Sequence, residues 1–389
     1  MARIALPLLF ALAACSHATK ITTDDKAAHG RALVVDAHSH VGEAIAYEGY
    51  DFMVRHTDHH EDLPRMREGG LDAEFLTILV HPDSVELTRY FGEALKQIDH
   101  LKGLCRANPK DLAFARTAEE VRANEEKNVV SLLLGVEGGH MLLPGSDAEQ
   151  LEHLRDFADA GVRYLTLSWS SSSPLGGSSA EDNLQGITEL GKKVVAEMQK
   201  LGMVIDLSHA SDPLFWDVIR LVHRPVILSN SNARALANHP RNASDAMLEA
   251  ISRNGGAICA NFSRSFLDDK FRAVAAPLMI TTKAMHNSER VALYQKQKNL
   301  PDVPVSKLID HLEYMIKIAG IDHVCLGSDF DGVPMTPNGL EDVSRLPIIT
   351  AELRKRGHTA TDIEKILGGN ILRVLEANEA PAAKARPRE

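Results

Sequence analysis

The stretch "VVDAHSHVGE" occupies Val34–Glu43. It starts with an apolar pair and runs through Asp36 to two histidines, His38 and His40, that are one residue apart. Side chains at i and i+2 of a strand lie on the same side, so the segment is predicted to be a buried strand that brings two imidazoles to one point. Neutral imidazole nitrogens are ligands that zinc favours. The stretch therefore raises the question of whether the protein holds a catalytic metal.

Short apolar and β-branched runs alternate with helical patterns along most of the chain. The expected strands are Leu33–His38, Phe75–Val80, Ser131–Val136, Val162–Leu167, Met203–Leu207, Pro225–Ser229, Ala257–Asn261 and His323–Gly327. The expected helices between them include Ser84–Ala107, Glu149–Ala160, Leu184–Leu201 and Val305–Ala319. Eight strands alternating with helices predict an α/β fold, the (β/α)8 TIM barrel, whose chemistry lies in the loops after the strands. A doubly wound open sheet is the alternative, but no glycine-rich dinucleotide fingerprint follows the first strand.

Polar side chains follow several of these strands. Besides the two histidines, they are Glu137 in "GVEGGH", Trp169 in "LTLSWS", His209 in "VIDLSHAS", Asn230 in "VILSNSN" and Asp329 in "LGSDFDG". Each alone is weak, because a histidine after a strand is more often a loop residue than a ligand. Together they can converge at the mouth of one barrel, as a metal requires, and a bound metal activates water and polarises a carbonyl for hydrolysis. Asp329 could then shuttle the proton, although an Asp that caps a loop is the other interpretation.

The composition sets few limits on function. The chain has 389 residues, of which 44% are hydrophobic and 25% charged, as is usual for a globular protein with a sizeable core. This length allows two average domains or one large barrel. The formal net charge is −10 and no basic stripe occurs, so we expect no nucleic-acid partner.

The first fifteen residues, "MARIALPLLFALAAC", have an early Arg, a short apolar run and small residues before Cys15. This pattern is typical of a secretory signal, and its end resembles a bacterial lipobox, in which the Cys carries lipid. A plain cleavable signal is the alternative. We expect a signal peptide over 1–15, a polar tether over 16–30, the barrel over 31–378 and a disordered tail over 379–389. The expected location is the bacterial cell envelope, with a lipid anchor on Cys15, at the outer membrane or facing the periplasm if the cell is Gram-negative.

The other cysteines, Cys105, Cys259 and Cys325, are odd in number and unrelated in spacing. They imply no disulfide framework. Cys259 and Cys325 lie inside apolar runs and are expected to be small buried side chains.

Many segments in order resemble the membrane (renal) dipeptidase family, zinc peptidases related to the amidohydrolase barrels. The likeness runs from about Leu33 to Ala377 and includes "EDLPRMREGGLDAEF", "LLGVEGGHML", "GVRYLTLSWS", "GMVIDLSHAS", "PVILSNSNAR", "NFSRSFLDD", "CLGSDFDGVP" and "KILGGNILRVL". The resemblance implies an amidohydrolase-like barrel, a dipeptide-like substrate and, as in many members of the family, a possible homodimer.

Five positions match the family's functional residues. The resemblance implies that His38 is a metal ligand, that Glu137 bridges two ions and that His209 binds the second ion. It implies that Arg241, in "NHPRNAS", meets the substrate carboxylate and that Asp329 is the catalytic acid or base.

Three positions depart from the family's pattern. His40 stands where the family usually has Asp, which is a mild change, since His-x-His is common in the wider amidohydrolase barrels. Asn230 replaces a histidine ligand, and an amide oxygen is a poor zinc ligand beside imidazole. Trp169 replaces a histidine on the substrate side and cannot act as an acid or base. We therefore expect one Zn²⁺, with a second site, at His209 and Asn230, that is weak or empty.

Two functions follow from these residues. The first is a zinc-dependent dipeptidase-like hydrolase, mononuclear or of altered specificity, that cleaves dipeptides or related small amides with a metal-activated water. The alternative is a catalytically impaired binding protein of the same fold on the cell envelope. Metal content measured beside dipeptide hydrolysis discriminates between them.

Overall fold

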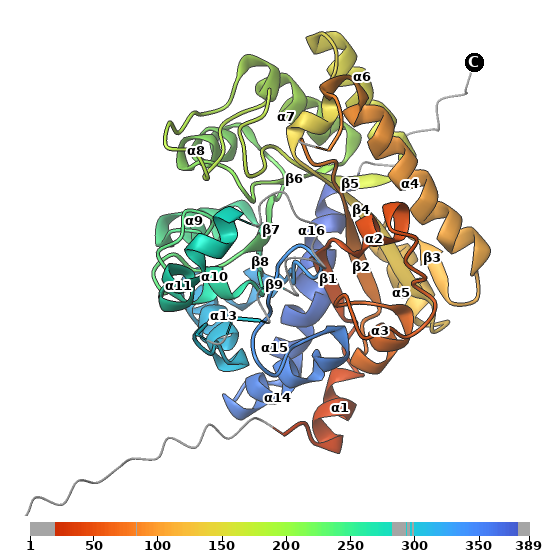
Figure 1. The fold of residues 1–389 in the computed structure, drawn as a ribbon, viewed down its shortest axis with the longest axis vertical. Helices are drawn as coiled ribbons and strands as arrows, with labels where there is room; N and C mark the ends of the chain where they lie inside the picture. Colours follow the sequence, from red (N-terminus) through yellow and green to blue (C-terminus); the bar gives the residue numbers. More distant parts are fainter. Residues whose placement is uncertain (1–19, 83, 282–292, 294–295, 298, 380–389) are drawn as a thin grey trace, which may run out of the picture.

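A computed structural model of the protein describes residues 20–82, 84–281, 293, 296–297 and 299–379. The expected signal peptide, Cys15 and residues 380–389 of the expected tail lie outside the described residues. In Figure 1 the strands gather at the centre and the helices surround them. The strands are β1 Val35–Ser39, β2 Ala73–Ile78, β3 Leu112–Phe114, β4 Val130–Glu137, β5 Val162–Thr166, β6 Val204–Asp206, β7 Ile227–Ser231, β8 Ala257–Ala260 and β9 Val324–Leu326.

The sheet is parallel and closes on itself. Its order is β2-β1-β9-β8-β7-β6-β5-β4-β3, and β2 also pairs with β4. Eight strands therefore form a closed barrel, while β3 pairs with β4 outside it. The predicted (β/α)8 barrel is confirmed; β3, three residues long, was not among the predicted strands.

Helices follow the barrel strands and cover their outer face. They are α1 Thr23–His29, α2 Val41–Tyr47, α3 Leu63–Gly69, α4 Tyr90–Ala107, α5 Ala118–Glu125, α6 Asp147–Ala160, α7 Glu189–Leu201, α8 Asp212–Leu221, α9 Asp245–Asn254, α10 Arg264–Leu267, α11 Asp269–Thr281, α13 Val305–Ala319, α14 Pro347–Lys355, α15 Ala360–Glu364 and α16 Asn370–Asn378. Short 3-10 turns lie at Leu87–Arg89, Gly139–Leu142, Ile321–His323 and Val343–Arg345, and a π-helical turn lies at Lys365–Gly369. Within the described part of the chain, no helix is both long and apolar enough to cross a membrane.

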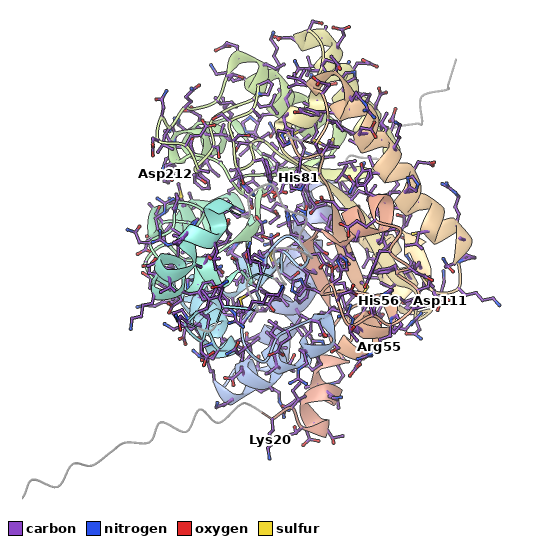
Figure 2. All side chains as sticks on the ribbon, in the orientation of Figure 1. Lys20, Arg55, His56, His81, Asp111 and Asp212 are labelled. Atoms are coloured by element: carbon purple, nitrogen blue, oxygen red, sulfur yellow. A yellow bond between two sulfur atoms is a disulfide. The ribbon has the colours of Figure 1, made fainter. Side chains whose placement is uncertain are left out.

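Two apolar cores follow from the alternation of side chains along each strand. Figure 2 shows side chains filling the space within and around the barrel. The larger core lies between strands and helices. The smaller core has members on all eight barrel strands: Val35, Ala37, Ala73, Phe75, Leu133, Tyr164, Val204, Ile227, Ala257, Cys259 and Cys325. It also includes residues of α5 and α16, so these two helices close one end of the barrel interior.

The start of the described chain differs from the expected polar tether over 16–30. Thr22 and Asp25 form a capping box, which satisfies free N–H groups at the start of α1. Asp25 pairs with Arg354 of α14. The buried His29 ring hydrogen-bonds with Thr350 Oγ1 at 2.7 Å and the Gly69 carbonyl at 2.9 Å. Residues 23–29 are therefore part of the folded domain, and in Figure 1 α1 lies beside α14.

The expectation that Cys259 and Cys325 are separate small side chains with no disulfide is wrong. The two residues are register partners on the neighbouring strands β8 and β9, and the structure joins them in a disulfide. They are 66 positions apart in the sequence, and only the barrel topology makes them neighbours. Cys105 is buried and free.

Candidate metal centre

A layer of polar side chains lies above the apolar interior of the barrel. Thr166, Asp206, Ser229 and Asn261 each lie two positions beyond an interior residue of their strand, and Glu137 lies four positions beyond Leu133 of β4. Asp206 Oδ2 accepts hydrogen bonds from Thr166 Oγ1 at 2.6 Å and Ser229 Oγ at 2.7 Å. Because the interior below is apolar, this layer places polar chemistry at one end of the barrel.

The histidines of β1 join this layer because the strand is irregular. The register of β1 against β2 shifts between Asp36 and Ser39. Val35 and Ala37 belong to the interior core, yet His38 also lies inside, in contact with Ser229 and Tyr164. A bulge changes the direction in which side chains point. Here it turns both imidazoles toward the barrel axis.

His38, His40 and Glu137 converge on one point. One ligand atom from each lies within 4.8 Å of the others, and all three residues are buried. The two Nε2 atoms are 3.2 Å apart. His38 Nε2 lies 3.4 Å from Glu137 Oε1, and His40 Nε2 lies 3.5 Å from Glu137 Oε2.

The far nitrogen of each ring has its own partner. His40 Nδ1 lies 2.8 Å from Glu43 Oε1, and His38 Nδ1 lies 3.0 Å from Ser229 Oγ and 3.1 Å from Tyr164 Oη. Metal-binding histidines usually hold their second nitrogen in this way, which fixes the ring and its tautomer. Both Nε2 atoms are thereby presented to the shared point.

These residues fit a metal ion. Glu137 Oε2 is buried and has no hydrogen-bond partner. Burial alone would raise the pKa of Glu137, but His38 and His209 hold it well below its usual range, so the carboxylate is charged. Two imidazole nitrogens and a carboxylate form a donor set that suits zinc. When bound, a metal at this point lowers the pKa of water and polarises a carbonyl.

His209 reaches this group through Glu137, whereas Asn230 does not join it. His209 Nε2 lies 2.9 Å from Glu137 Oε1, and its Nδ1 has no partner. Burial lowers the pKa of His209, and the charge of Arg241 lowers it further. Asn230 Oδ1 instead accepts a hydrogen bond from Arg241 Nη2 at 2.7 Å. The amide oxygen that would have to replace an imidazole ligand is thus already engaged.

Arg241 is buried, but one end of its guanidinium has no partner. Nη2 is held by Asn230, while Nη1 finds no hydrogen bond. A hollow lined by His209 and Arg241, among others, lies beside it. An unpaired buried guanidinium nitrogen is costly, and a carboxylate oxygen is the acceptor that it suits best.

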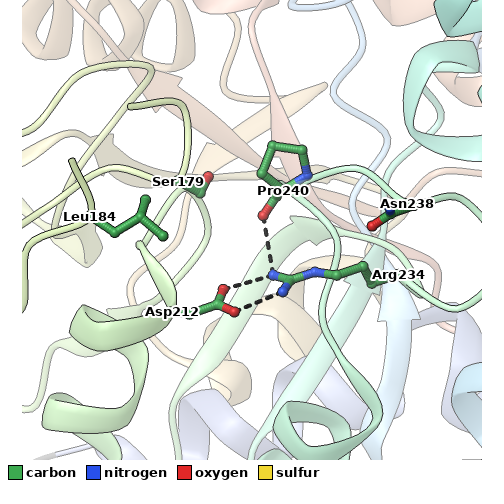
Figure 3. Close-up of a pocket in the computed structure, with 6 residues that line it drawn as sticks. All are labelled: Ser179, Leu184, Asp212, Arg234, Asn238 and Pro240. Carbon is green, nitrogen blue, oxygen red and sulfur yellow. Dashed lines mark hydrogen bonds and ion pairs between the residues drawn. The ribbon is translucent and has the colours of Figure 1, made fainter. Parts of the chain in front are cut away.

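The segment that carries Arg241 is clamped to α8. Arg234 forms a two-pronged ion pair with Asp212, at 2.7 and 2.8 Å, and its Nε donates to the Asn242 carbonyl at 2.7 Å. Figure 3 shows this pair beside Pro240, whose carbonyl accepts a further bond from Arg234 at 3.4 Å. The contacts on both sides of position 241 fix the backbone from which the guanidinium projects.

Asp329 faces the same centre from the loop after β9. Its Oδ1 lies 3.4 Å from His40 Nε2, and its Oδ2 accepts from Asn261 Nδ2 at 2.8 Å. Asp329 (φ 62°) and His209 (φ 64°) both adopt the left-handed region, which non-glycine residues enter at a cost and which is frequent at functional sites. A Cβ on Gly332 would lie 2.2 Å from Asp329 Oδ1 and 2.4 Å from the His40 ring, so only glycine fits there.

Trp169 is half-buried at the edge of the centre. Its ring meets His81 edge-on at 5.3 Å and lies 6.1 Å from His140. His81, labelled in Figure 2, also contacts Glu43 Oε2 at 3.2 Å. The tryptophan is therefore linked to His40 through His81 and Glu43.

Sequence reasoning missed several contributors to the centre. They are Glu43, His81, Tyr164, Asp206, Ser229 and Asn261. Only Glu43 carried a visible signal, because it follows His40 by three positions in the opening stretch. The others become neighbours only when the barrel closes.

Comparison with known protein families shows to which family the chain belongs. The sequence profile described as membrane dipeptidase, peptidase family M19, matches residues 24–389. The chain belongs to the membrane dipeptidase family. Among relatives of this membrane dipeptidase homologue, human Dipeptidase 3 is 31% identical over 364 residues, which are 91% of this chain and 66% of that protein. An uncharacterized dipeptidase of Schizosaccharomyces pombe is 32% identical, over 83% of this chain and 73% of its own length. The chain thus spans slightly less than two thirds of the length of human Dipeptidase 3.

Solved structures of dipeptidases share the fold. The probable dipeptidase PvdM from Pseudomonas aeruginosa has a TM-score of 0.78 and 26% identity, over 91% of this chain and 97% of its own. A metallo peptidase from Rhodobacter sphaeroides, liganded with a phosphinate mimic of the dipeptide L-Ala-D-Ala, has a TM-score of 0.74 and 27% identity, over 90% and 99%. The membrane dipeptidase homologue is thus similar to these chains over nearly their whole length.

Proposed function

We propose that this chain is a metal-dependent hydrolase that cleaves dipeptides or closely related small amides. The observation that carries the proposal is the convergence of His38, His40 and Glu137 at 4.8 Å or less, in a chain of the membrane dipeptidase family. The dipeptide mimic bound by the similar Rhodobacter sphaeroides peptidase supports the substrate class. Zinc is the metal we propose, because its usual ligands are imidazole nitrogens and carboxylates.

The protein's own residues divide the work. Arg241 holds the terminal carboxylate of the dipeptide with the nitrogen that is free of Asn230. Asp329 takes a proton from the attacking water at Oδ1 and returns it to the leaving amine, while Asn261 holds Oδ2. Glu43 fixes the His40 ring. Trp169 contacts the rings of His81 and His140 and stands where the family has a substrate-side histidine, so we assign it to the substrate pocket.

The proposed enzyme differs from the family's pattern in the number of metal ions, because we propose one ion where the family's pattern has two. The engagement of Asn230 by Arg241 supports a single tightly held zinc. We also propose that the chain is anchored to the bacterial cell envelope by lipid on Cys15, on the strength of the "LAAC" ending of its apolar N-terminal run. A homodimer is a further proposal, which rests on the family alone.

The test is zinc content per chain after purification without added zinc, measured beside hydrolysis of a panel of dipeptides. One zinc per chain with turnover is the expected result, and Glu137→Gln should abolish both. Bound zinc without turnover on any dipeptide or small amide would overturn the hydrolase proposal and leave the impaired binding protein in its place.

A further inference from the structure

A second cluster of carboxylates lies behind the histidines, on the other side of the barrel wall. Carboxylate oxygens of Asp36, Glu61 and Glu74 lie within 4.8 Å of one another. Asp36 and Glu74 are register partners on β1 and β2, between neighbours that face the interior core. Their side chains therefore point outward, beneath the segment before α3 that carries Glu61.

These carboxylates are buried with few partners. Asp36, Glu61 and Glu74 are 2%, 0% and 0% exposed. Asp36 Oδ2, Glu61 Oε1 and both oxygens of Glu74 have no hydrogen-bond partner. None of the ion pairs found among the described residues involves these three side chains. Buried charges without partners cost several kcal/mol each, so something must compensate them.

Two histidines that precede Glu61 in the chain are directed at a different carboxylate, Asp331. His59 Nδ1 and His60 Nδ1 each lie 3.3 Å from Asp331 Oδ1. The backbones of residues 60 and 331 are joined to this pair, since His60 N–H donates to Asp331 Oδ1 and Asp331 N–H to His60 Nδ1. His60 Nδ1 accepts a hydrogen bond from the Asp331 N–H and so donates to no carboxylate, while His59 Nδ1 faces Asp331 rather than the cluster. The negative charge of Asp331 adds to the field around Glu61 and Glu74.

Either a proton or a cation could neutralise the cluster. Burial, with the charges of Asp36 and Asp331, raises the pKa of Glu74 to about 8, so a proton shared with Glu61 is one solution. That proton would satisfy one oxygen of each glutamate and leave Asp36 Oδ2 and the second Glu74 oxygen without partners. A cation can contact one oxygen of each of the three carboxylates at once. Calcium binds oxygens at about 2.3–2.6 Å, so oxygens on one ion lie less than about 5 Å apart, as these do.

We propose that Asp36, Glu61 and Glu74 bind one calcium ion, at a site separate from the His38–His40–Glu137 centre. The donors are all carboxylate oxygens, which hard cations such as calcium prefer. The histidine centre differs, because two of its donors are imidazole nitrogens. The site is sealed from solvent, which disfavours Mg²⁺ because that ion usually keeps several waters.

The calcium site supports the catalytic strand from behind. Ser39, between the two histidines, donates to Glu61, and Asp36 Oδ1 accepts from the backbone N–H of His38 at 3.2 Å and of Ser328 at 2.8 Å. An ion that fixes Asp36 and Glu61 therefore fixes the irregular part of β1. Its loss should loosen both imidazoles without removing any ligand of the other metal.

The test is equilibrium dialysis of the full chain against radioactive Ca²⁺, with saturating Zn²⁺ to fill the histidine site. We expect one Ca²⁺ per chain, and at least tenfold weaker binding by the double variant Glu61→Gln/Glu74→Gln, which keeps side-chain size. Glu352→Gln, at a buried glutamate of α14 that does not belong to the cluster, should bind Ca²⁺ as the unmodified chain does. His38→Ala should lose zinc and keep calcium.

Two results would overturn the proposal. Absence of bound Ca²⁺ from the folded, unmodified chain would leave the shared proton as the explanation. Equal binding by the double variant would mean that the ion binds elsewhere on the surface. If circular dichroism shows that the double variant is unfolded, Glu61→Gln alone is measured and must weaken binding by the same tenfold criterion.

Discussion

Replacing Arg241 by lysine tests the proposed grip on the substrate carboxylate. The guanidinium divides its nitrogens between two tasks: Nη2 holds Asn230 Oδ1 at 2.7 Å, and Nη1 is free for a ligand. A lysine has one nitrogen, which cannot reproduce this planar fork. Arg241→Lys must therefore give up either the bond to Asn230 or a bond to the substrate.

The expected loss is one charge-assisted hydrogen bond, about 1.5–3 kcal/mol. At about 1.4 kcal/mol per factor of ten, this corresponds to a 10- to 100-fold fall in kcat/KM. The fall should appear mainly as a higher KM, because the carboxylate is bound alike in the ground state and the transition state. Zinc content should not change, since Arg241 does not belong to the group formed by His38, His40 and Glu137.

The assay compares steady-state hydrolysis of a dipeptide with that of the same dipeptide amidated at its C-terminus. Arg241→Lys should penalise the free acid and have little effect on the amide, which has no carboxylate to lose. Arg163→Lys serves as the control: among the described residues, Arg163 hydrogen-bonds with the backbone carbonyls of Ala158 and Gly161, on the outside of the barrel. If the free acid and the amide respond equally to Arg241→Lys, the assignment of Arg241 to the carboxylate is refuted.

Three further predictions concern the metal and the anchor. His38→Ala should remove most bound zinc. Zinc affinity should fall by more than the 10- to 100-fold that is typical when a residue hydrogen-bonded to a metal ligand is lost. His209→Ala should remove much less zinc, and equal losses in the two variants, measured by elemental analysis, would contradict the proposal of a single zinc site. Asn230→His should raise zinc occupancy toward two per chain and free Arg241 from its amide partner; occupancy that stays at one would show that the altered ligand is not what limits the second ion. Cys15→Ala should release the protein from the membrane fraction or leave its precursor uncut, and unchanged fractionation with normal processing would rule out the lipid anchor.

The barrel could be predicted from the sequence because its signals are local. Each strand is a short apolar run. The run that ends in His38 and His40 already indicates which end of the barrel carries the metal-binding side chains. Glu137 could be found for the same reason, since it directly follows an apolar strand. The helix over Thr23–His29 was also within reach, because Thr22 and Asp25 have the spacing of a capping box.

What the sequence could not show depends on closure of the barrel. Asp206 joins Thr166 and Ser229 only because β5, β6 and β7 are adjacent, and nothing in their spacing along the chain indicates it. The disulfide between Cys259 and Cys325 has the same origin. The bulge in β1 is a third case: simple alternation correctly placed His38 and His40 together but gave no sign that Ala37 would lie on the interior side as well.

The position of α1 limits how far the folded domain could lie from a membrane if Cys15 carries the proposed lipid. Because α1 begins at Thr23 and packs on α14, only residues 16–22 remain between Cys15 and the folded body. Seven residues span at most about 25 Å even when fully stretched. A lipid on Cys15 would therefore keep the folded domain close to the membrane, with α1 as the point where the linker joins that domain. Peptides released near the bilayer would then meet the barrel within about one protein diameter of where they are released. Lengthening the linker by insertion should alter hydrolysis of such peptides and leave hydrolysis of freely dissolved peptides unchanged.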